Sequence, residues 1–100
     1  MERLAKVFQA QHYASEDMVL ELSRLAQENS WVINHPWTAQ RWLPISQAAW
    51  VGHRRAVEAL LEMGADLSLK VGASGEELTI ADFTRQSGNG EIAELLERSR

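Results

Sequence analysis

The chain has 100 residues, of which 45% are hydrophobic and 24% charged, and it contains no cysteine. This composition predicts a single globular domain and excludes a disulfide framework, a thiolate zinc site and a cysteine nucleophile. The net charge of −4 argues against a nucleic acid as partner, since such binding relies on clustered Lys and Arg.

The N-terminal ten residues do not have the pattern of a secretory signal, because charges at positions 2, 3 and 6 interrupt them. No stretch reaches the roughly 20 consecutive apolar residues that a membrane-spanning helix needs. We therefore expect a cytoplasmic protein with no membrane partner.

A helix pair is expected at the start of the chain. Residues 2–11 predict the first helix, with Leu4, Val7, Phe8 and Gln11 at helical spacing. A second helix is expected over residues 16–28, with Ser15 as its N-cap and an acidic first turn. Its apolar face would consist of Met18, Val19, Leu22, Leu25 and Ala26.

An internal similarity organises the second half of the chain. Gly52 and Gly88 lie 36 residues apart, and each is followed by apolar residues four, five, seven and eight positions on. This spacing predicts a helix after each glycine, the later one over residues 90–98. A short helix is also expected before each glycine, over residues 44–51 in the first unit and after the N-cap Thr79 in the second.

The residues of these two units resemble the ankyrin repeat family. LPISQAAWVGH at residues 43–53 is similar to the family signature TPLHxAAxxGH, and VEALLEMGADLS at 57–68 is similar to its ending, LLxxGADVN. In the second unit, TIAD at 79–82 stands where the family has TPLH or TPLD. The resemblance covers residues 38–98.

This resemblance implies an all-α fold, an ankyrin-type solenoid of stacked antiparallel helix pairs joined by loops. Residues 1–37 would form a divergent N-terminal cap, residues 38–70 the central repeat and residues 71–100 a C-terminal capping repeat. Three units would just satisfy the stacking that a repeat array requires.

Three of the four tryptophans, Trp31, Trp37 and Trp42, lie in the segment 30–42, and the fourth is Trp50. One interpretation is that residues 31–33 fold back to close the core. The other is that the tryptophans face a partner, because rigid aromatic side chains are enriched in interface hot spots. We expect Trp37 and Trp50 to form one exposed aromatic patch.

The family's pattern implies where a partner would bind. Two variable positions before each Gly-His turn, and the loop before each helix pair, line the concave face of such proteins. With Trp37, the implied protein-binding residues are Ala39, Gln40, Trp42, Trp50, Val51, Glu76, Leu78, Gln86 and Ser87.

No motif in the sequence predicts catalysis, a metal or a cofactor. His12, His35 and His53 lack metal-ligand spacing, and no nucleophile or phosphate-binding motif occurs. We expect a monomeric, non-catalytic module that binds another protein, for example as a stoichiometric inhibitor, an immunity-type protein or a regulator. The alternative is a structural subunit that forms an obligate homodimer through its Trp-rich loop.

Overall fold

The computed structural model describes residues 2–99, and α-helices dominate them, so the all-α expectation is confirmed. The only sheet in this range is a two-stranded antiparallel hairpin. No helix within it is long and apolar enough to cross a membrane. The elements are α1 (Glu2–Ser15), α2 (Val19–Glu28), the 3-10 helix η1 (Ser30–Asn34), α3 (Pro44–Val51), α4 (Arg54–Glu62), β1 (Lys70–Val71), β2 (Leu78–Thr79), α5 (Ile80–Gln86) and α6 (Gly90–Arg98).

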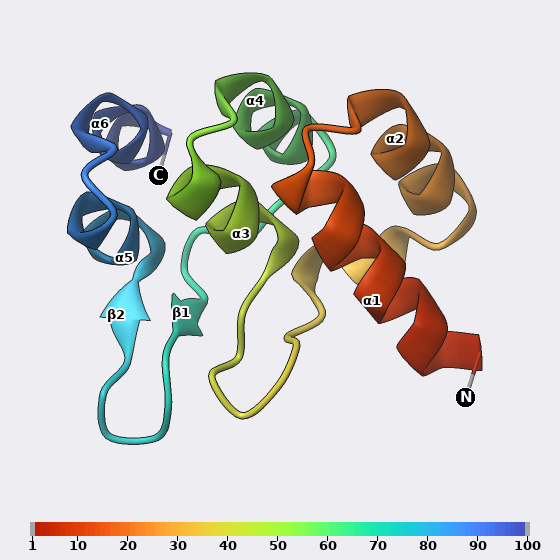
Figure 1. Ribbon diagram of the computed structural model, residues 1–100, viewed down its shortest axis with the longest axis horizontal. Helices are drawn as coiled ribbons and strands as arrows, with labels where there is room; N and C mark the ends of the chain where they lie inside the picture. The colour runs from red at the N-terminus through yellow and green to blue at the C-terminus, as the bar shows by residue number, and fades with distance from the viewer. Residues whose placement is uncertain (1, 100) are drawn as a thin grey trace.

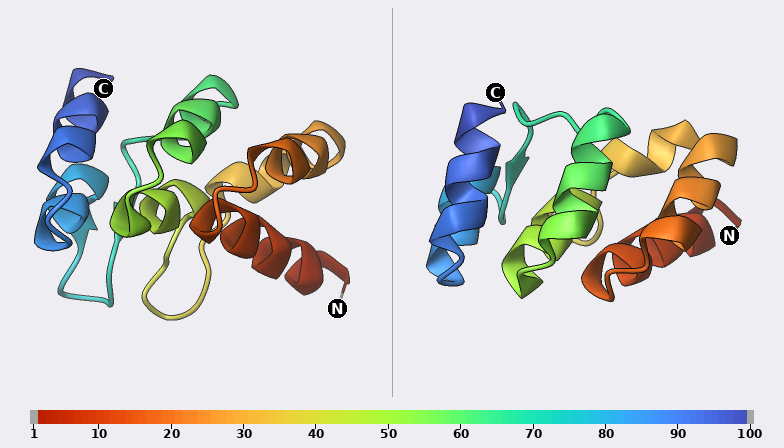
Figure 2. Two further views of the ribbon diagram at one scale, coloured as in Figure 1. Left: turned by 45° about the horizontal axis from the view of Figure 1, so that its top comes forward. Right: turned by 90° about the horizontal axis from the view of Figure 1, so that it is seen from above.

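The helices are arranged as three pairs that lie side by side: α1 with α2, α3 with α4, and α5 with α6 (Figure 1). The first helices of the pairs form one row, in which α3 lies between α1 and α5, and the second helices form the other (Figure 2). Two loops, 37–42 and 72–77, project away from the row of α2, α4 and α6.

Each helix pair turns at a residue with left-handed backbone. These residues are Asp17 (φ 58°), Gly52 (φ 96°) and Gly88 (φ 88°). In the first two pairs the residue after the turn makes an equivalent hydrogen bond to the carbonyl five positions before it. Met18 N–H donates to the Tyr13 carbonyl (2.8 Å), and His53 N–H donates to the Ala48 carbonyl (2.9 Å). The first pair therefore repeats the geometry of the second, with an aspartate in the place of the glycine.

The expected start of the second helix is wrong. Helix α1 continues to Ser15, whose hydroxyl donates to the His12 carbonyl, and α2 begins only at Val19. Because Asp17 adopts a left-handed conformation, residues 16–18 form the turn and Ser15 does not cap α2.

The core draws buried residues from all three pairs. Val32 and Ile33 in η1 are almost fully buried. For these two residues the interpretation that the segment folds back onto the core is confirmed. Trp31 is half-buried, with the Arg3 guanidinium 4.3 Å from its ring centroid. Of the apolar face expected on the first helix, Val7 is buried but Leu4 and Phe8 are exposed. Ala10 and Ala14 take the remaining core positions of α1, so its buried face is centred away from Leu4 and Phe8.

Side-chain amides join neighbouring pairs. The Asn89 amide, before α6, donates to the carbonyls of Ala49 (3.1 Å) and Trp50 (2.9 Å) in α3. The Asn34 amide donates to the Gly64 carbonyl, and its oxygen accepts from Asp66 N–H at 2.8 Å. These bonds satisfy backbone groups that the helix and turn ends leave unpaired, so they fix how adjacent pairs stack.

Candidate functional site

The loop before α3 is a short hairpin. Trp37 and Trp42 exchange two backbone hydrogen bonds: Trp37 N–H donates to the Trp42 carbonyl (2.7 Å) and Trp42 N–H to the Trp37 carbonyl (3.0 Å). Thr38 and Arg41 turn the chain with φ values of 68° and 55°. The two tryptophans are therefore held opposite each other at the base of the hairpin.

This hairpin is bonded to the β1–β2 hairpin. Gly72 N–H donates to the Gln40 carbonyl (2.6 Å), Arg41 Nε–H donates to the Gly72 carbonyl (3.3 Å), and the Arg41 guanidinium lies 3.3 Å from the Glu77 carboxylate. We call residues 37–42 and 70–79 the paired hairpins. They lie side by side below α3 and α5 in Figure 1.

Of the residues in the paired hairpins, Gly72 is expected to tolerate substitution least. It has φ +117°, and a Cβ there would lie 2.8 Å from the Glu76 carbonyl oxygen. Gly75 has φ +88° but nothing within 4 Å of its Cβ position, so Gly75→Ala is the matched control. We expect Gly75→Ala to cost about 1 kcal/mol through left-handed strain, and Gly72→Ala to cost about 1 kcal/mol more through the clash.

Urea unfolding measures the loss of folding free energy in both variants. The backbone amide NMR signals of residues 37–42 report whether the hydrogen bond from Gly72 N–H to the Gln40 carbonyl survives. Equal losses in the two variants would contradict the importance of the close contact at Gly72.

The predicted tryptophans, Trp37 and Trp50, lie in separate ring pairs. Trp50 is 40% exposed, and its ring centroid is 4.7 Å from that of Phe83 in α5. Trp37 is half-buried and contacts Phe8 of α1 edge to face, with centroids 5.9 Å apart. Each of the two tryptophans therefore packs on a phenylalanine of a neighbouring helix, and a shared aromatic surface for Trp37 and Trp50 stays a prediction.

The other predicted residues are distributed between the paired hairpins and the ends of α3 and α5. The exposed ones are Ala39, Gln40, Val51, Glu76 and Gln86. The half-buried ones are Trp42, Leu78 and Ser87. Ser87 also has a structural contact, since its hydroxyl donates to the Thr84 carbonyl at 2.6 Å and accepts from the Asn89 amide.

Sequence reasoning missed an apolar groove on α1. A cavity of about 490 Å³ is lined by Leu4, Ala5, Phe8, Gln9 and Trp37. Leu4 and Phe8 are 54% and 55% exposed. The signal that could have found them is a second apolar face on the same helix, Val7, Ala10 and Ala14 at i, i+3 and i+7, which can bury the helix without Leu4 and Phe8.

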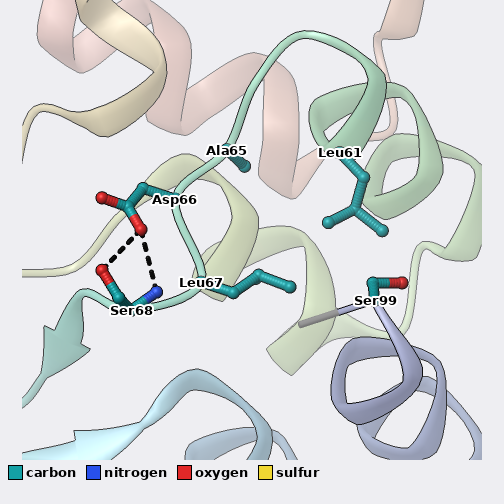
Figure 3. Close-up of a pocket in the computed structure, with 6 residues that line it drawn as sticks. All are labelled: Leu61, Ala65, Asp66, Leu67, Ser68 and Ser99. Carbon is teal, nitrogen blue, oxygen red and sulfur yellow. Dashed lines mark hydrogen bonds between the residues drawn. The ribbon is translucent and has the colours of Figure 1, made fainter.

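A further cavity, of about 410 Å³, lies between the end of α4 and the end of α6 (Figure 3). Leu61 and Leu67 point into it, while the Asp66 carboxylate turns back onto Ser68. The Ser68 hydroxyl (2.6 Å) and N–H (2.9 Å) both donate to that carboxylate and lower the pKa of Asp66 below its ordinary value. This carboxylate thus serves a local turn.

The histidines lie apart, on different segments. His12 stacks on Phe8, the His35 ring nitrogen lies 3.0 Å from the Pro36 carbonyl, and His53 precedes α4. Within residues 2–99 no three His, Cys, Asp or Glu side chains are placed to hold a metal ion. Comparison with protein-family models, with curated proteins and with solved structures finds no significant match for this chain.

Proposed function

We propose that the chain is a small ankyrin-type repeat protein that binds a protein partner without catalysis. Three features support this proposal. The segment 43–53 forms α3 and its glycine turn. The turns within the helix pairs contain left-handed residues that are 35 and 36 positions apart. Hairpins project beside the first helices of the pairs. The binding face would be formed by α1, α3, α5 and the paired hairpins.

The observation that carries the proposal is the position of the exposed apolar side chains. Among residues 2–99, the large apolar side chains that are exposed on α1 and α3 are Leu4, Phe8, Trp50 and Val51. In the other row, the one exposed large apolar side chain among the described residues is Leu20, on α2. Four of the five exposed large apolar side chains in the described range thus belong to the first helices of their pairs, and clusters of exposed apolar side chains are typical of protein-binding surfaces.

Binding would be preorganised docking. The helix row fixes α1, α3 and α5, and the Gly72–Gln40 bond holds the two hairpins together. A partner would therefore meet a surface that loses little conformational entropy on binding. A module of this kind acts as an inhibitor, an immunity-type protein or a regulator by covering a site on its partner.

Capture of the partner from an extract of the native host tests the proposal. Trp50→Ala removes an aromatic anchor, and Val51→Lys places a charge on the face while suiting the C-terminal end of α3. We expect each to weaken capture by about tenfold or more. Leu20→Ala is the matched control, because Leu20 is 61% exposed but lies on α2.

Variants with wild-type melting curves that all capture the partner equally would refute the proposed face. Light scattering of the full chain separates the homodimer alternative: a stable dimer that Trp37→Ala dissociates would favour the structural subunit.

A further inference from the structure

A cavity of about 200 Å³ lies between α1, α3 and the hairpin 37–42. Its described lining residues are Phe8, Gln11, His12, Ser15, Trp37, Trp42 and Gln47. We call it the α1–α3 pocket. It shares Phe8 and Trp37 with the apolar groove on α1, so the two hollows adjoin.

Aromatic rings form much of the wall of the α1–α3 pocket. Two hydrogen bonds join the backbones of Trp37 and Trp42, and Phe8 contacts the Trp37 ring edge to face. The face of an indole or phenyl ring attracts a cation, and tryptophan does so most strongly. A cationic side chain is therefore better suited to this wall than an anionic one.

The side-chain amide of Gln11 connects two walls of the pocket, α1 and the hairpin 37–42. Gln11 is 6% exposed, and its Nε2 donates to the Trp42 carbonyl at 3.1 Å, which fixes the orientation of the amide. Its Oε1 accepts no hydrogen bond from any described residue. Because that oxygen is itself buried, it is closed to an occupant, and the part that Gln11 plays in the pocket is to join α1 to the hairpin 37–42.

The helix end beside the pocket carries a partial charge of the sign that a cation requires. Gln11, His12 and Ser15 belong to the last turns of α1, where the carbonyl ends of the helix carry partial negative charge. The exposed Glu16 follows directly, and neither Lys nor Arg is among the described lining residues. The whole chain has a net charge of −4.

We infer that the α1–α3 pocket receives an arginine side chain of the protein partner, an inference that rests on the proposed function. The planar guanidinium stacks on aromatic faces and carries five N–H donors, so it can lie against the tryptophan rings with its donors toward the carbonyl end of α1. The apolar stem of the arginine, or a neighbouring apolar side chain, would lie against Phe8 and Leu4 in the adjoining groove.

The test is a titration of the full, ¹⁵N-labelled chain with the blocked peptide acetyl-Gly-Arg-Gly-amide. The indole N–H signals of Trp37 and Trp42 and the side-chain amide of Gln11 report on the pocket. Two matched peptides replace arginine by citrulline, which keeps its shape without the charge, or by norleucine, which keeps only an apolar stem. We expect saturable shifts with arginine and binding about tenfold weaker or more with either control.

Two tryptophan variants locate the site. Trp42→Leu removes one ring of the pocket and should abolish the arginine-dependent shifts at Trp37. Trp50→Leu makes the same change on α3 outside the pocket and should leave those shifts intact. Gln11→Met removes the hydrogen bond to the Trp42 carbonyl at similar side-chain length and should weaken arginine binding in a chain whose melting curve shows that it remains folded.

Equal shifts with arginine and citrulline, or with arginine and norleucine, would overturn the inference, as would the absence of any shift at Trp37, Trp42 and Gln11. These outcomes are independent of partner capture. If capture depends on Trp50 and Val51 while the peptide does not bind, the arginine site is wrong and the proposed function stands. If no partner is captured through Trp50 and Val51, the proposed function fails whatever the peptide does.

Discussion

A fragment that ends at Lys70 is expected to lose cooperative unfolding and to be poorly soluble. The deletion removes α5, which packs directly on α3, and the buried residues of the third pair. It also removes the Asn89 amide from the carbonyls of Ala49 and Trp50, and Phe83 from the Trp50 ring. The remaining two pairs would expose the side of α3 that now faces α5.

The size of this effect follows from how stacked pairs are stabilised. In such an array the free energy of folding is nearly a sum of unit terms and interface terms between neighbours. A domain of this size has only about 5–15 kcal/mol in total, so the loss of one unit and one interface removes much of it.

Thermal melting followed by circular dichroism measures this loss, with the full chain as reference. We expect a broad, shallow transition for the fragment. A fragment with the full-length melting temperature would contradict the stacked packing of α3 and α5.

The sequence predicts the middle and the end of the chain well because their signals are local. Pro44 begins α3 and Gly52 ends it in a left-handed conformation, as the pattern indicates. Thr79 caps α5, and its hydroxyl accepts from Asp82 N–H at 3.1 Å. These features depend on residues within a few positions of each other, so one sequence is enough to find them.

The turn after α1 and the hairpin 37–42 lack such signals. Asp17, Thr38 and Arg41 all adopt positive φ without a glycine, which residue type alone does not predict. At the candidate site, Trp50 could be placed at the surface from its position in the short helix. The contacts of Trp37 and Trp42 could not be predicted. Phe8, which contacts Trp37, is distant in sequence, and the hydrogen bond from Gln11 to Trp42 spans 31 positions.

Adjacent leucines in α4 provide the sharpest test of the core. Leu60 is fully buried, whereas Leu61 is half-buried and lines the cavity between α4 and α6 in Figure 3. Both substitutions to alanine change the same atoms in the same helix, so differences in helix propensity cancel. We expect Leu60→Ala to cost about 2–5 kcal/mol, since the surrounding core cannot close the hole.

Leu61→Ala is the matched control, with an expected cost of about 1 kcal/mol, because part of its side chain already faces solvent. Urea unfolding of both variants gives the two free energies, and an unchanged denaturant slope shows that each still unfolds from the native fold. If Leu61→Ala destabilised the chain as much as Leu60→Ala, both leucines would lie in the core. The ends of α4 and α6 would then have to pack closely enough to fill the cavity that separates them.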